Sequence, residues 1–168
     1  MNELVIGSDG FIGARLMAMA QCEGTTRRSK TKPEKLHFDL LDMPPQSKWA
    51  DKYHVYYLCA GANGAKRCEG SQNAFVANVD APIAIAKAVK GFVVYVSSMS
   101  VEWMDGAYQR QKLAAETVLR TMPNVGIVRA GRVVNSNVDD LCKALLEVGR
   151  GRLTGVTRWG TDEIAYQK

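Results

Sequence analysis

The ten residues LVIGSDGFIG, from Leu4 to Gly13, decide the fold of this chain. The first three are apolar and predict a short buried strand, and three glycines then follow at intervals of three residues. Apolar side chains recur after them at helical spacing, at Phe11, Ile12, Leu16, Met17 and Ala20. A strand, a glycine turn and a helix in immediate succession predict the first unit of an α/β sheet.

The glycine turn predicts a loop that binds phosphate. Gly7 permits a sharp exit from the strand, Gly10 lets backbone amides approach a pyrophosphate, and Gly13 lets the helix pack closely on the sheet. The free N–H groups and positive dipole end of the helix favour an anion there. The alternative is an ordinary strand-to-helix turn, since the chain contains 15 glycines. The turn residues expected to bind a dinucleotide are Gly7, Ser8, Asp9, Gly10, Phe11, Ile12 and Gly13.

Composition predicts one soluble globular domain. The chain has 168 residues, of which 46% are hydrophobic and 23% charged, enough for one sizeable core. The net charge of +5 fits an anionic small molecule, and no nucleic-acid recognition motif with interleaved aromatic residues is present. The four cysteines lack metal-binding spacing, so we expect free thiols, no metal site and a cytoplasmic location. We expect neither a signal peptide nor a membrane span.

Strands and helices alternate along the rest of the chain. We expect strands at 25–26, 36–40, 54–60, 92–96, 125–128 and, in the tail, 163–166. We expect a first helix closed by Gly24, a helical turn near Trp49 capped by Ser47, and helices at 74–89 (kinked at Pro82), 107–119 and 138–148. The pattern predicts a Rossmann-type, doubly wound parallel sheet in a three-layer αβα arrangement, as a single domain over residues 1–168. Such sheets bind ligands at the C-terminal ends of their strands.

A tyrosine and a lysine lie four residues apart in the helix expected at 107–119. Residues at this spacing share one helix face, so Tyr108 and Lys112 point the same way. A nearby ammonium lowers the pKa of a phenol, which otherwise lies near ~10 and suits acid-base catalysis poorly. Ser98, at the end of the preceding strand, can hydrogen-bond a substrate oxygen. These residues predict proton transfer to a carbonyl or alcohol beside a nicotinamide; an exposed tyrosine and a solvated lysine are the alternative.

Four stretches now support a resemblance to a known family. They are Gly7-x-x-Gly10-x-x-Gly13, Val94-Tyr95-Val96-Ser97-Ser98, Tyr108-x-x-x-Lys112 followed by Leu113-Ala114-Ala115-Glu116, and Val128-Arg129-Ala130-Gly131-Arg132-Val133. In this order they resemble the short-chain dehydrogenase/reductase superfamily. More specifically, they resemble the extended branch of this superfamily, which contains NAD(P)-dependent nucleotide-sugar epimerases, dehydratases and reductases such as dTDP-4-dehydrorhamnose reductases.

The resemblance implies a role for individual residues. Tyr108 would be the general acid/base, Lys112 would lower its pKa and hold the nicotinamide ribose, and Ser98 would orient the substrate oxygen. Further cofactor-binding positions implied by the resemblance are Asp39 and Leu40 beside the adenine, and Ala60, Gly61 and Ala62 after the fourth strand. Asn78 stands where the family often has a helix asparagine, although it can equally be an ordinary helix residue.

Two departures from the extended branch affect the expected substrate. Only residues 99–107 join Ser98 to Tyr108, and the segment after Val134 is too short for the branch's C-terminal substrate domain. We therefore expect no separate substrate domain and an open pocket over the nicotinamide. Such a pocket suits a small carbonyl compound, or a sugar-type substrate if a partner completes it. The family often dimerises through the helices expected here at 74–89 and 107–119, so we expect a homodimer.

The end of the second strand predicts the cofactor. NAD enzymes usually have an acidic residue there, whereas NADP enzymes have arginine, and this chain has Arg27 and Arg28. A guanidinium matches the 2′-phosphate in a bidentate way, so we expect NADP in preference to NAD. Two solvated surface arginines are the alternative.

Three functions remain open from the sequence. The first is an NADP-dependent oxidoreductase or epimerase/dehydratase-like enzyme. The second is a module that binds NADP(H) as a sensor or regulator and has lost its substrate site. The third, which the sequence favours least, is a basic protein that binds nucleic acid.

Overall fold

The computed structural model describes residues 1–28, 35–42 and 51–160. These residues form a seven-stranded, entirely parallel sheet in the order β3-β2-β1-β4-β5-β6-β7. The strands are β1 (Glu3–Ile6), β2 (Glu23–Thr26), β3 (Leu36–His37), β4 (Val55–Leu58), β5 (Phe92–Ser98), β6 (Val125–Ala130) and β7 (Gly155–Trp159). The strand order reverses direction beside β1, which is the switch point where such sheets bind ligands. The predicted fold class is confirmed.

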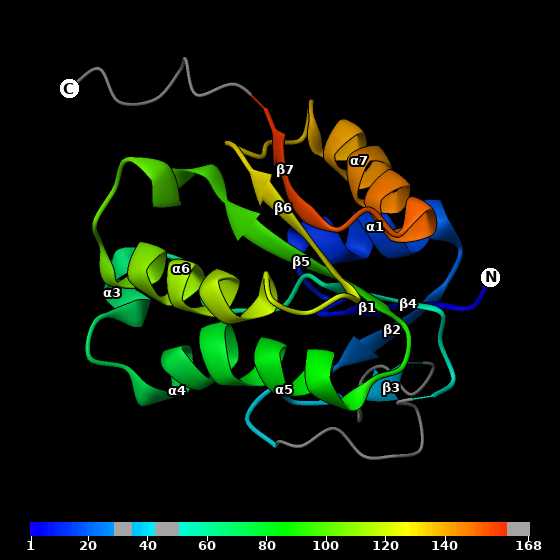
Figure 1. Cartoon of the computed structure of the whole chain (residues 1–168), viewed down its shortest axis with the longest axis horizontal. Helices are drawn as coiled ribbons and strands as arrows, with labels where there is room; N and C mark the ends of the chain where they lie inside the picture. The colour runs from blue at the N-terminus through cyan, green and yellow to red at the C-terminus, as the bar shows by residue number, and fades with distance from the viewer. Residues whose placement is uncertain (29–34, 43–50, 161–168) are drawn as a thin grey trace.

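Helices cover both faces of the sheet, so the molecule has three layers (Figure 1). The helices α1 (Phe11–Ala20) and α7 (Val138–Gly151) lie against each other on one face. The other face is covered by α3 (Ala65–Cys68), α4 (Gln72–Phe75), α5 (Ala81–Ala88) and α6 (Ala107–Leu119). Each face of the sheet has its own apolar core, which explains the continuous apolar runs in β4 and β5.

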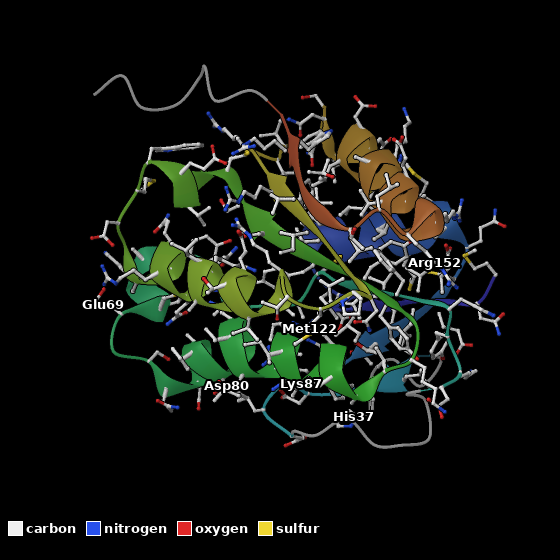
Figure 2. The ribbon with its side chains drawn as sticks, viewed as in Figure 1. His37, Glu69, Asp80, Lys87, Met122 and Arg152 are labelled. Atoms are coloured by element: carbon white, nitrogen blue, oxygen red, sulfur yellow. The ribbon has the colours of Figure 1, made fainter. Side chains whose placement is uncertain are left out.

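Charged side chains are distributed around this core. Asp80 and Lys87 extend outward from the helical layer that contains α5, and Glu69 and Arg152 lie at other edges of the molecule (Figure 2). No helix in the described part of the chain is both long enough and apolar enough to span a membrane.

The glycine turn forms as the sequence predicts. Gly7 has φ of 90°, and a Cβ there would come within 2.7 Å of the backbone of Ala60 at the end of β4. A Cβ on Gly13 would collide with the carbonyl oxygen of Gly7. Both positions therefore require glycine because backbone from two elements meets there.

The expected role of Gly24 is wrong. The first helix ends at Ala20 with Gln21 as its left-handed cap, and Gly24 lies inside β2. A Cβ on Gly24 would lie 2.5 Å from the side chain of Ser8 and 2.6 Å from the sulfur of Met17. The glycine is needed for close packing of β2 on the turn and on α1, and not to end a helix.

The helix expected at 74–89 is a helical path in three parts. After α4 comes a π-helical segment, Val76–Asp80, which leads into α5 with Pro82 in its first turn. Proline has no N–H and its ring crowds the carbonyl four residues earlier, which is that of Asn78. The Tyr95 hydroxyl donates a hydrogen bond of 3.1 Å to this carbonyl instead. The irregularity thus lies before Pro82 and is stabilised from β5.

Other expectations differ mainly at element boundaries. The strand expected at 36–40 is reduced to two residues, and Phe38 to Leu40 continue as a loop toward the ligand-binding edge. The edge strand β7 was not predicted, because its sequence GVTRW is half-exposed and has no continuous apolar run, with only Val156 and Trp159 as large apolar residues. The helical turn expected near Ser47 and Trp49 and the strand expected at 163–166 lie outside the described residues.

Candidate functional site

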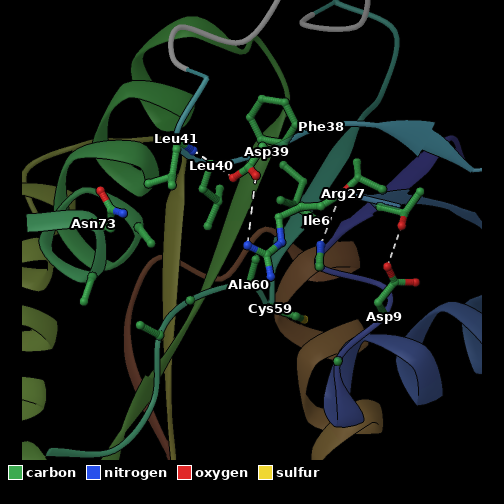
Figure 3. Close-up of a pocket in the computed structure, with 18 of the residues that line it drawn as sticks. Ile6, Asp9, Arg27, Phe38, Asp39, Leu40, Leu41, Cys59, Ala60 and Asn73 are labelled. Carbon is green, nitrogen blue, oxygen red and sulfur yellow. Dashed lines mark hydrogen bonds and ion pairs between the residues drawn. The ribbon is translucent and has the colours of Figure 1, made fainter. Parts of the chain in front are cut away.

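A cleft of about 560 Å³ opens at the C-terminal ends of β1, β2 and β4 (Figure 3). Ten of the predicted cofactor residues line it: Gly7, Asp9, Gly10, Arg27, Arg28, Asp39, Leu40, Ala60, Gly61 and Ala62. They come from the glycine turn, from the end of β2, from the loop after β3 and from the loop after β4. Segments far apart in the sequence thus meet at the predicted edge of the sheet.

Hydrogen bonds fix the glycine turn against β2. Ser8 is fully buried, and its hydroxyl donates to the carbonyl oxygen of Thr25 at 2.9 Å. The Thr25 hydroxyl accepts from the N–H of Gly7 at 3.1 Å, and the Thr26 hydroxyl donates to Asp9 at 2.5 Å. Ser8 therefore supports the turn from behind. Six other predicted cofactor residues also lie outside the lining of this cleft: Phe11, Ile12, Gly13, Asn78, Tyr108 and Lys112.

One rim of the cleft carries opposite charges. The Arg27 guanidinium lies 4.0 Å from a carboxylate oxygen of Asp39, and the Arg27 side chain is 73% exposed (Figure 3). The other oxygen of Asp39 accepts a hydrogen bond of 3.1 Å from the N–H of Leu41, which shapes the loop after β3. An exposed ion pair of this length contributes little to stability, so Arg27 can turn to an anionic ligand at small cost.

Asn78 holds the opposite wall in place. Its side-chain oxygen accepts from the N–H of Ala62 at 2.9 Å, and its nitrogen donates to the Ala62 carbonyl at 2.9 Å and to Gln111 at 2.8 Å. A Cβ on Gly61 would lie 2.7 Å from the Asn78 oxygen. Asn78 thus ties the loop after β4 to α6.

Sequence reasoning missed part of this wall. Arg67, Ser71, Asn73, Ala74 and Ala77, from α3 to the π-helical segment, also line the cleft. The only signal was the polar, glycine-containing stretch after the fourth strand, which predicted a loop without indicating which of its side chains face the ligand.

Lys112 is buried near the end of β5, beside Tyr108. Its ammonium donates a hydrogen bond of 2.9 Å to the carbonyl oxygen of Val96 near the end of β5. The Nζ atom lies 4.5 Å from the ring centre of Tyr95 and 5.9 Å from that of Tyr108. Burial lowers the pKa of Lys112 to about 8, so the lysine is still mainly protonated at pH 7.

The expectation that Lys112 lowers the pKa of Tyr108 is wrong for this structure. Burial, with a smaller contribution from Cys68, raises the pKa of Tyr108 to about 12. The lysine hydrogen-bonds the backbone of β5 and not the phenol, so desolvation of the phenolate dominates. Tyr108 is therefore a neutral phenol at pH 7 and can donate a proton.

Ser98 lies in a short chain of hydroxyl and amide groups. Its Oγ is 2.8 Å from that of Ser100 and accepts from the N–H of Ser100 at 3.2 Å. Gln109, next to Tyr108, donates to the Ser100 hydroxyl at 3.0 Å. The sequence did not indicate Ser100 or Gln109, yet they connect Ser98 to α6. Ser98, Tyr108 and Lys112 are not part of the lining of the 560 Å³ cleft.

Comparison with solved structures assigns the fold. The chain superposes on MoeE5 in complex with UDP-glucose and NAD with a TM-score of 0.76, at 19% identity, over 96% of this chain and 76% of that one. The NAD-dependent NDP-hexosamine 5,6-dehydratase TunA gives 0.76, at 17% identity, over the same shares. A short-chain dehydrogenase from Burkholderia cenocepacia in complex with NADP gives 0.78, at 14% identity, over 95% and 87%.

The chain therefore has the Rossmann-type fold of short-chain dehydrogenases/reductases. No protein-family model and no curated protein matches its sequence.

Proposed function

We propose that this chain is an NADP-dependent oxidoreductase that acts on a small carbonyl or alcohol. The observation that carries the proposal is the meeting of two sets of residues at one edge of the sheet. Arginines, an aspartate and a glycine turn line an elongated cleft, and a buried lysine and a neutral phenol lie at the neighbouring strand end.

The cleft suits a dinucleotide. The glycine turn offers N–H groups to a pyrophosphate, and Arg27 and Arg28 offer guanidinium groups at the end of β2. Asp39 and Leu40 form an adenine-side wall, and the loop held by Asn78 forms the other. In this proposal Arg27 leaves Asp39 and binds the 2′-phosphate of NADP. The solved neighbours with NAD and with NADP support dinucleotide binding in general.

Tyr108, Lys112 and Ser98 are the proposed reaction residues. When bound, a nicotinamide supplies or accepts the hydride. Tyr108 gives its proton to the developing alkoxide of a carbonyl substrate, which its neutral state at pH 7 allows. Lys112 holds the ribose hydroxyls with its remaining N–H groups, and Ser98 orients the substrate oxygen.

The cofactor preference is tested by removing the two arginines together. In the double variant Arg27→Ala/Arg28→Ala, NADPH should bind about ten- to a hundredfold more weakly, since the charge-assisted contact that the pair makes with the 2′-phosphate contributes about 1.5–3 kcal/mol. NADH affinity should change little. Isothermal titration calorimetry measures both, and Lys87→Ala/Lys143→Ala is the matched control, because it removes two positive charges from exposed helix positions. Equal affinity of the parent protein for NADPH and NADH would reject this assignment.

A second candidate is a sensor or regulatory module that binds NADP(H) without turnover. The separation of Ser98, Tyr108 and Lys112 from the lining of the cleft favours it. One measurement distinguishes the enzyme from the sensor: the rate of NADPH consumption with a panel of small aldehydes and ketones. Turnover that depends on Tyr108 supports the enzyme, whereas tight binding with no turnover on any member supports the sensor.

The size of the available walls bears on the chemical class of the substrate. Two of the solved neighbours involve nucleotide sugars: MoeE5 is in complex with UDP-glucose, and TunA is an NDP-hexosamine 5,6-dehydratase. The stretch that joins Ser98 to Tyr108 is short, residues 99–107, and so offers little wall beside the proposed reaction residues. A large ligand needs extensive walls to be held in a reactive pose, so we propose a small carbonyl compound as the substrate of the chain alone.

A further inference from the structure

Glu116 lies one helical turn after Lys112 on α6, in the position where a glutamate normally pairs with a lysine. Both side chains are buried, with exposed fractions of 0% for Glu116 and 6% for Lys112. Among the described residues, however, Lys112 forms no ion pair, and its ammonium hydrogen-bonds the Val96 carbonyl. Another group must therefore bind the carboxylate of Glu116 and keep it from pairing with the ammonium of Lys112.

Arg129, on β6, engages that carboxylate at both oxygens. Its Nε donates to Oε1 at 3.0 Å, and its Nη2 donates to Oε2 at 2.6 Å. Arg120 adds a hydrogen bond of 2.8 Å to Oε2 only. Burial opposes ionisation of Glu116, but the hydrogen bonds and charge of Arg129, with smaller contributions from Ser97 and Arg120, together outweigh burial, and the pKa of Glu116 falls below its ordinary value. The carboxylate is therefore charged and satisfied at neutral pH.

Arg129 also reaches the segment that begins at Ser98. Its Nη1 donates to Glu102 at 2.6 Å, in the 3₁₀ turn Met99–Glu102 that follows β5. Arg158 on β7 donates to the same oxygen at 2.7 Å. One buried guanidinium thus links β6 to the two segments that carry Ser98 and the Tyr108–Lys112 pair.

Without Arg129, Glu116 would keep the hydrogen bond from Arg120 but lose the guanidinium that engages both of its oxygens, and weakening the compensation of a buried carboxylate is costly. Lys112 is the buried cation one turn away. The other titratable groups that face Lys112 are neutral: Cys59 after β4, Cys68 on α3, Tyr95 on β5 and Tyr108 on α6. Glu116 is therefore the one carboxylate, among the described groups found to act on Lys112, that can draw its ammonium from the end of β5.

We propose that Arg129 is a positioning residue, which occupies the carboxylate of Glu116 and so keeps the ammonium of Lys112 at the end of β5, beside Tyr108 and available to the cofactor. This inference rests on the proposed function for the role of Lys112. The arrangement of the charges can be tested without any cofactor.

The test compares Arg129→Met with the double variant Arg129→Met/Glu116→Gln. The control is Arg150→Met, which breaks another bidentate pair with a buried carboxylate, that of Glu3, at the opposite end of the strands. The titration of Lys112 is followed by NMR of ¹³C-lysine-labelled protein, with the signal assigned from Lys112→Met. NADPH affinity is measured by calorimetry on the same samples.

In Arg129→Met, the Lys112 midpoint should rise by about one pH unit as the lysine pairs with Glu116, and NADPH affinity should fall about tenfold. Both changes should disappear in the double variant, and Arg150→Met should cause neither. An unchanged Lys112 midpoint in Arg129→Met, or a rise that persists without the Glu116 carboxylate, would overturn the inference.

Two further outcomes are covered by the design. If Arg129→Met does not fold, Arg129→Lys replaces it, because a lysine keeps the charge but not the two-point contact. A smaller rise of the Lys112 midpoint is then expected, and no rise overturns the inference. If the parent protein binds neither NADPH nor NADH, the proposed function fails, while the NMR titration still decides whether Arg129 positions Lys112.

Discussion

Lys112 carries a positive charge into the interior, and this must reduce the stability of the protein. Its pKa of about 8, against an ordinary value of 10.5, corresponds to about 3 kcal/mol disfavouring the charged form. The hydrogen bond to the Val96 carbonyl and the contact with the Tyr95 ring offset part of this cost. A buried lysine that lowers the stability of the fold, and whose ammonium is nevertheless held by specific contacts, is typical of a functional site.

Replacing this lysine with methionine should stabilise the protein. For Lys112→Met we expect the free energy of unfolding at pH 7 to rise by about 1–3 kcal/mol, since the buried charge is removed and one hydrogen bond is lost. Between pH 8 and 10.5 the unfolded parent binds more protons than the folded parent, so parent stability rises with pH in this window. The advantage of the variant should therefore be complete below pH 8 and disappear above 10.5.

Urea unfolding at a series of pH values measures this difference. Lys143→Met, at an exposed position on α7, is the control and should show no such pH dependence. A Lys112→Met protein that is less stable than the parent at pH 7 would show that the contacts of Lys112 outweigh its burial.

Tyr108 should act as an acid more readily than as a base, since burial raises its pKa to about 12. With a carbonyl substrate, Tyr108→Phe should lower kcat about a hundredfold to ten-thousandfold and leave NADPH affinity nearly unchanged, because only a proton donor is deleted. In the parent, the reduction rate should be flat across neutral pH, and the reverse oxidation should rise with pH because it needs the phenolate. Steady-state kinetics in both directions measures this, and near-parental turnover of Tyr108→Phe would exclude the acid role.

At the scale of elements, the glycine turn depends on the end of β4 as much as on its own sequence. Gly7→Ala would place a Cβ 2.6–2.7 Å from Ala60 in addition to requiring φ of 90°. We expect a loss of more than about 3 kcal/mol in stability, or failure to fold. Gly64→Ala has nearly the same φ, 86°, with no atom within 4 Å, and should cost only about 1–2 kcal/mol. Chemical denaturation of both variants isolates the collision, and equal losses would contradict this explanation.

The π-helical segment Val76–Asp80 also depends on a side chain from another element, the Tyr95 hydroxyl on β5. Tyr95→Phe should cost about 1–3 kcal/mol because it leaves the Asn78 carbonyl without its donor. Pro82→Ala supplies an N–H that can take over this carbonyl, so the effects of the two changes should be less than additive in the double variant. Additive losses, measured by thermal unfolding, would mean that the two groups do not compete for the same oxygen.

For the whole molecule, the layer of α4, α5 and α6 carries exposed apolar side chains among its charged ones. Three large apolar residues are exposed there: Phe75 on α4, and Leu113 and Val118 on α6. We expect a homodimer through this surface, and light scattering should give twice the 18.4 kDa of one chain. Leu113→Glu should give the monomer mass, whereas Leu153→Glu, at an exposed apolar residue between α7 and β7, should not. A monomeric parent at micromolar concentration would rule out the dimer.

Local sequence patterns were enough to predict a parallel sheet without its edge strand β7, the edge at which the cleft opens, and the bounds of α6. Local sequence signals are enough for these predictions: apolar runs mark β1, β4 and β5, and helical periodicity marks α6. The glycine turn could also be predicted without tertiary contacts, because its sequence allows few backbone conformations. The same signals placed Gly7, Gly10 and Ala60 around one cleft, because parallel strands all end at one edge.

Which polar groups meet, and what burial does to them, depends on contacts in three dimensions. The half-exposed edge strand β7 and the cleft residues Arg67 and Asn73 are positioned by contacts between segments that no local pattern relates. The raised pKa of Tyr108 has the same origin, since the proximity of Lys112 in sequence predicted a fall but desolvation depends on the surrounding atoms. The pairing of Glu116 with Arg129 instead of Lys112 follows from the packing of α6 on β6. Charge interactions depend on distance and burial in three dimensions, whereas helical and strand periodicity depends only on position along the chain.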